Sequence, residues 1–221
     1  MKQNFIEAKK MYQATTAYLK TISNGLHDLF NSTGKVFDRQ LFLNQYDSLL
    51  QFSLLEVAIS DNFLDIEELE FIRDLTDNAD FIVYINKKFS TNIKWQTILN
   101  SNEQQIADFL LNIRPAMNVL KDDFSKCFAL YDHLDKKYDC LDLLRKSTAA
   151  LLWRISNEDG ETTDWEITAA KHSMILDTLK EIQININYLS NMENDALKST
   201  DASTTNSLKS IYNNKLKKTD Q

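Results

Sequence analysis

The chain has 221 residues, an apolar fraction of 43%, a charged fraction of 26% and a formal net charge of −7, a composition typical of a globular protein with a substantial core. The acidic balance argues against general nucleic-acid binding, which requires a basic face. Only three glycines and one proline occur, so the residues that form hairpin turns are scarce and we predict an all-α fold.

The cysteines and the N-terminus give further expectations. Cys127 and Cys140 form no CxxC pair, and the three histidines stand apart in the sequence, so neither a disulfide framework nor a zinc site is expected. The N-terminus lacks an apolar signal core, and no run of about 18 apolar residues occurs. We therefore expect a cytoplasmic protein that stays out of the bilayer interior.

Apolar side chains at helical spacing predict a series of helices joined by short polar turns. The expected helices cover 2–30 (ended by Gly34), 37–59, a stretch from Asp65, 81–89, 93–99, 106–113, a helix started or kinked by Pro115, 140–155 and 164–189. Within the fourth helix the letters FIVYI are strand-like in composition. We divide the chain into an N-terminal helix (1–34), a helical domain (35–192) and a disordered polar tail (193–221).

The tail ends in a short basic amphipathic stretch. Leu208, Ile211, Tyr212 and Leu216 fall at helical spacing beside several lysines. This stretch could dock on a partner or make a peripheral contact with an anionic membrane surface. The alternative is a frayed end without a binding role.

Two acidic helix–turn–helix junctions repeat the same pattern. Asp61 and Asp159 are each followed at once by a residue that tolerates the left-handed backbone conformation. Glu68 and Glu166 follow seven positions later. In both places the preceding helix is apolar and the following helix is amphipathic, so the chain is expected to use one acidic helix–turn–helix unit twice.

Each junction also contains a capping box. Asp65 with Glu68, and Thr163 with Glu166, have the spacing at which the cap side chain and the glutamate bind each other's backbone N–H groups. Several carboxylate oxygens on a short turn are also the usual setting for a hard cation such as Ca²⁺ or Mg²⁺. The candidate metal ligands are Asp61, Asp65, Glu68, Asp159 and Glu166. An EF-hand is unlike this pattern, because its first ligand position would fall on Ile155, which cannot ligate.

The segments SDNFLDIEE and NEDGETTDWE resemble the TerB-like (tellurite-resistance) family, in which Asp-Gly-x-apolar-x-x-x-Glu follows an apolar helix twice in one helical domain. The resemblance implies a helical bacterial module linked to stress response, tellurite resistance and phage defence, which binds metal ions through these acidic residues. Asn62 replaces the usual glycine in the first unit, and Thr162 occupies the apolar position in the second. The matching positions are Asp61, Glu68, Asp159 and Glu166.

No catalytic motif supports an enzyme: a nucleophile elbow, HExxH, GxGxxG and a P-loop are all missing from the sequence. We expect a non-enzymatic module that binds a divalent cation or a protein partner through the acidic junctions. The alternatives are a purely structural interaction subunit, in which the carboxylates only cap helices, and a metal-dependent hydrolase. Trp95 and Trp153 are expected in the core, whereas Trp165, at the second position of its helix, would anchor a partner if it is exposed.

Overall fold

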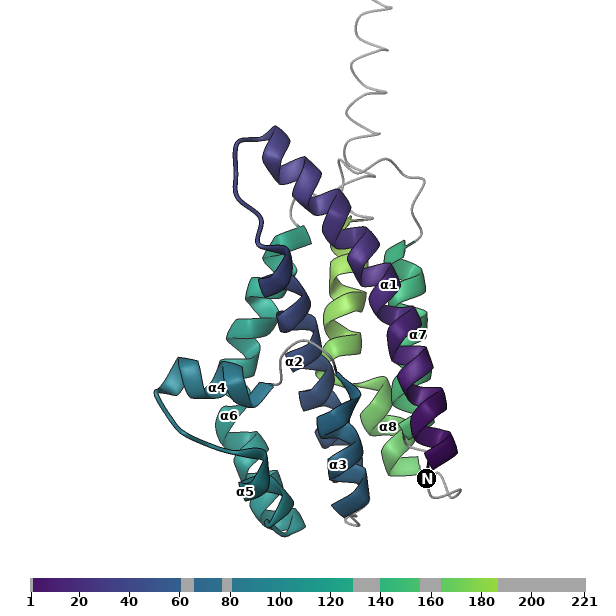
Figure 1. Ribbon diagram of the computed structural model, residues 1–221, viewed down its shortest axis with the longest axis vertical. Coiled ribbons are helices and arrows are strands. Elements are labelled where there is room, and N and C mark those ends of the chain that lie inside the picture. Colours follow the sequence, from purple (N-terminus) through teal and green to yellow (C-terminus); the bar gives the residue numbers. More distant parts are fainter. Residues whose placement is uncertain (1, 61–65, 77–80, 129–139, 156–163, 187–221) are drawn as a thin grey trace, which may run out of the picture. The chain divides into compact units, whose positions relative to one another are not determined.

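The computed structural model describes residues 2–60, 66–76, 81–128, 140–155 and 164–186, and these ranges are helical and contain no strand (Figure 1). The helices are α1 (Lys2–Ser32), α2 (Arg39–Ala58), α3 (Ile66–Leu75), α4 (Phe81–Phe89), α5 (Trp95–Leu99), α6 (Glu103–Lys126), α7 (Cys140–Ile155) and α8 (Asp164–Lys171). A further helix covers 174–186, and we call it the final helix because it is the last one in the described ranges. None of the helices in these ranges is long and apolar enough to cross a bilayer. The all-α prediction is confirmed.

The chain divides into two compact units, Met1–Gln183 and Ile184–Gln221, and all packing described below lies in the first. The predicted tail, 193–221, lies outside the described residues. Within the first unit α1 packs along α7, and an ion pair between Glu7 and Arg154 joins the start of α1 to the end of α7.

Helix α2 is the central helix of this unit. It contacts α1, α3, α4, α6, α7 and α8, and most of its length is buried, polar residues included. Aromatic rings surround it: Phe42 stacks on Phe124 with centroids 5.0 Å apart. Some of its buried polar groups have partners on other helices, such as Asp47, whose carboxylate accepts from the Tyr12 hydroxyl at 2.8 Å. A helix covered on every side carries no single apolar stripe.

Two expectations about helix boundaries are wrong. Pro115 does not start a helix, because α6 continues through it from Glu103 to Lys126; a kink at Pro115 stays a prediction. Proline removes the N–H that would bind the carbonyl of Leu111, but both residues lie on the exposed face, where water can satisfy that carbonyl. The expected long helix over 164–189 is broken at His172 and Ser173.

The break lets the final helix begin against α2. Its first N–H groups are bound by side chains of another helix: the N–H of Ile175 donates to Ser53 Oγ at 3.0 Å, and the N–H of Met174 donates to Glu56. A continuous helix would use these N–H groups internally. The two caps on α2 therefore favour a new helix start at this point.

Candidate functional site

The helices flanking both predicted acidic junctions meet at one end of the bundle. In Figure 1 the end of α2, the start of α3, the end of α7 and the start of α8 all lie at the end where α1 begins. We call this the turn end. Helix α3 begins five residues after Asp61, and α8 begins five residues after Asp159. This agreement is consistent with a repeated unit.

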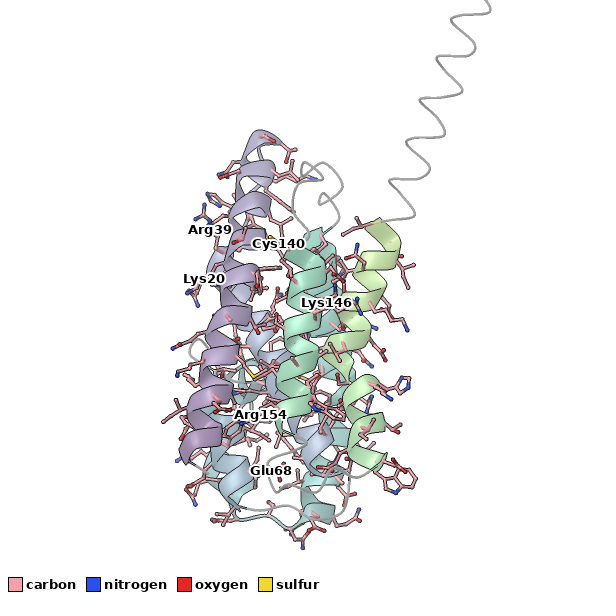
Figure 2. The ribbon with its side chains drawn as sticks, turned by 90° about the vertical axis from the view of Figure 1, so that its right-hand side faces the viewer. Lys20, Arg39, Glu68, Cys140, Lys146 and Arg154 are labelled. Atoms are coloured by element: carbon pink, nitrogen blue, oxygen red, sulfur yellow. The ribbon has the colours of Figure 1, made fainter. Side chains whose placement is uncertain are left out.

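Of the five predicted metal ligands, Asp61, Asp65 and Asp159 lie outside the described residues. Glu68 is half-buried in α3, and it lies closer to the turn end than Arg154 does (Figure 2). Glu166 is only 7% exposed, in the first turn of α8. Both glutamates have interaction partners within the protein. Among the residues that the structure describes, no group of three or more His, Cys, Asp or Glu side chains could hold a metal ion, so the metal site stays a prediction.

The two predicted capping boxes also depend on residues outside the described ranges, namely Asp65 and Thr163. A capping box that the sequence reading missed begins α6. The Asn102 side chain accepts from the N–H of Gln105, and the Gln105 side chain accepts from the N–H of Asn102, both at 2.9 Å. The Asn-x-x-Gln spacing before an apolar helix is the signal that would have identified it.

Large apolar side chains are exposed at the turn end. Trp165 is 72% exposed and Ile66 is 56% exposed, each in the first turn of its helix. The condition under which Trp165 would anchor a partner, an exposed side chain, is met. Trp153 was expected in the core, and this is wrong: Leu151 and Leu152 take the inward positions of the last turn of α7, and Trp153 is exposed.

An open cleft of about 820 Å³ lies beside the first turn of α3. Its apolar lining consists of Ile66, Leu69 and Leu99, and its polar lining is the stretch 100–104, which runs from the end of α5 into the first turn of α6. Leu69 and Leu99 are buried, whereas Ile66 is exposed. The cleft can therefore take an apolar side chain at its base and offer hydrogen bonds along one wall.

A cluster of polar side chains lies where the final helix starts. Burial raises the pKa of Glu56 to about 7, although the charge of Arg114 and the hydrogen bonds from Met174 and Arg114 act to lower it. The Glu56 side chain is 16% exposed, and its carboxylate lies 2.7 Å from an Arg114 nitrogen. Nearby, Ser173 is buried and its hydroxyl has no hydrogen-bond partner in the described structure. The Glu56 carboxyl can therefore change its charge near neutral pH.

The Cys127 thiol stays protonated at neutral pH. Burial, with a smaller contribution from Asp123, raises the pKa of Cys127 to about 11. Cys127 and Cys140 are both free and partly buried. A thiol that stays protonated at neutral pH is a poor nucleophile, so Cys127 is a packing residue.

Comparison with protein-family models gives no match, and neither the curated proteins nor the solved structures contain a match to the chain. The helices of the described residues define the class of the protein, an all-α bundle built around a buried central helix. The resemblance to the TerB-like family rests on the two acidic sequence segments alone.

Proposed function

We propose that this chain is a non-enzymatic helical module that binds a protein partner at the turn end. The observation that carries the proposal is the exposure of Trp165 in the first turn of α8. Tryptophan is enriched at the energetic centres of protein interfaces. The exposed Ile66 and the adjacent cleft add an apolar contact and a recess at the same end. A role in bacterial stress response or phage defence, implied by the TerB-like resemblance, belongs to this proposal.

Site-specific photocrosslinking in the native host tests this proposal. A photoreactive phenylalanine analogue replaces Trp165 or, as a matched control, Leu111, which is 65% exposed on α6. We expect a discrete crosslinked protein from position 165 and none from position 111. A product of twice the chain mass would identify a second copy as the partner. Equal labelling at both positions, or none at 165, would refute binding at the turn end.

A divalent cation is the second candidate ligand of this end. It is favoured by the common position of the starts of α3 and α8, from which the predicted ligands Glu68 and Glu166 come. Oxygen ligands on short turns suggest a dissociation constant on the order of 10⁻⁵ to 10⁻³ M. Calorimetry with Ca²⁺, Mg²⁺ and Mn²⁺ should show binding that Glu166→Gln weakens. If no ion gives heat or a thermal shift, the carboxylates serve only as helix caps.

A further inference from the structure

A basic and aromatic tip lies where α4 ends and α5 begins. Residues 81–102 contain three lysines and no aspartate or glutamate, in a chain whose net charge is −7. Lys87, Lys88 and Lys94 are exposed, and Phe89 between them is 49% exposed. Figure 1 shows α4 projecting sideways, with its C-terminal end at the outer edge of the bundle. We call these four residues the basic tip.

The turn that carries the basic tip has a fixed shape. The Asn86 side chain accepts from the N–H of Ile93 at 2.7 Å and donates to the Ile93 carbonyl at 2.8 Å. The N–H of Thr91 closes the end of α4 by donating to the Asn86 carbonyl at 3.1 Å, around Ser90 at a φ of 53°. This is the hydrogen bond of a Schellman motif. A turn ordered before binding loses less entropy on contact with a ligand.

Folding stability accounts for only part of the basic tip. Lys87 and Lys88 lie in the last turn of α4, where positive charge offsets the helix dipole. Lys94 has no such explanation, because it is the N-cap of α5, where it makes no side-chain cap and positive charge is disfavoured. Phe89 gains nothing from exposure to water. A ligand that binds both a positive charge and an exposed apolar ring explains Lys94 and Phe89 together.

We propose that the basic tip contacts the surface of a membrane that contains anionic lipids. The lysine ammonium groups bind lipid phosphates, and the Phe89 ring enters the boundary between headgroups and acyl chains. A projecting tip fits a planar surface, whereas single-stranded nucleic acid is bound in a basic groove lined by several aromatic rings. The acidic remainder of the chain is repelled by the same lipids, so the protein meets the membrane tip first.

Vesicle co-sedimentation of the full chain tests this proposal. The wild type should bind vesicles of phosphatidylcholine mixed with phosphatidylglycerol, should not bind phosphatidylcholine alone, and should be released by salt. Each lysine of the tip replaced by alanine should weaken binding about fivefold. Phe89→Ala should weaken it further, without changing the salt dependence. The four positions are exposed, so unchanged circular dichroism should confirm that the variants fold.

Matched controls separate the tip from other surfaces. Lys10→Ala and Lys20→Ala, two exposed lysines of α1 (Lys20 is labelled in Figure 2), should leave vesicle binding unchanged. The proposal is overturned if the wild type ignores anionic vesicles, or if tip variants bind as well as the wild type, which would assign binding to another part of the chain. Tip-dependent binding to a single-stranded oligonucleotide without vesicle binding would also overturn it and would assign the tip to nucleic acid.

Discussion

Replacing Glu56 by glutamine should change how the stability of the protein depends on pH. The pKa of Glu56 rises from its usual 4.5 to about 7 because burial disfavours the charge. A carboxyl with a raised folded-state pKa contributes stability that is fully present below the unfolded pKa and is lost as pH rises through the folded pKa. Each tenfold change in proton affinity corresponds to about 1.4 kcal/mol. The loss of stability therefore begins near pH 4.5, is complete above pH 7 and amounts to about 3 kcal/mol in total.

Glutamine keeps an oxygen that can accept from the N–H of Met174, but it has no charge to bury. Glu56→Gln should therefore lose less stability than the wild type between pH 5 and pH 8, by about 2.5 kcal/mol. The measurement is urea unfolding of both proteins at each pH. The comparison with the wild type cancels the contribution of other titrating groups.

Arg114 supplies a second variant with an opposite expectation. Its charge lowers the pKa of Glu56, so Arg114→Met should raise that pKa further and move the stability loss to higher pH. If the ion pair outweighs burial, Glu56→Gln will instead destabilise the protein and leave the pH dependence no flatter. That result would refute the conclusion that burial controls this carboxyl.

Three further substitutions test local contacts by urea unfolding. Ser90→Gly should stabilise the protein by up to about 1 kcal/mol, because glycine adopts a φ of 53° without the steric cost that serine carries; destabilisation would mean that the serine side chain has a role of its own. Asn102→Ala should cost about 1 kcal/mol through loss of the cap on Gln105, and an unchanged stability would show that the capping box is dispensable. Tyr46→Phe should cost about 1 kcal/mol by removing the buried hydrogen bond between its hydroxyl and Thr148 at 2.6 Å, a loss that would not occur if water replaced the hydroxyl.

Local sequence patterns were sufficient to predict most helices. The ranges expected for α4 and α7 agree with Phe81–Phe89 and Cys140–Ile155, because apolar spacing and helix ends are set within a few turns of chain. The segment FIVYI is helical despite its strand-like composition, and Phe81, Ile82 and Ile85 are the residues of α4 that are buried. Spacing along the helix therefore outweighed the strand preference of the individual residues.

The break at His172 and Ser173 has only one weak signal in its own sequence, a serine directly before the new helix. No proline or glycine marks it, and the groups that cap the new helix, Ser53 and Glu56, belong to α2. Sequence patterns report caps only when the capping residue is a chain neighbour. A cap that arrives from another helix becomes visible only in the folded structure.

The candidate site was predicted in part, and the errors have local causes. Trp165 was singled out because the second residue of a helix is commonly exposed, and its side chain is 72% exposed. Trp153 was misplaced because its size was weighed above its position, although Leu144, Leu151 and Leu152 define the inward face of α7. The basic tip was missed because net charge was read for the whole chain, whereas the segregation of charge within residues 81–102 is visible in the sequence.

Buried polar side chains of α2 hold the ends of several other helices. Gln51 accepts from the N–H of Phe81 at the start of α4 at 3.1 Å, and donates to Thr76 after the end of α3 at 2.8 Å. Ser53 and Glu56 hold the start of the final helix in the same manner. A buried helix end without partners costs as much as a lost hydrogen bond or more. These helices therefore depend on α2 for their ends, and this shared dependence explains why a helix so deeply buried keeps polar residues at Gln51, Ser53 and Glu56.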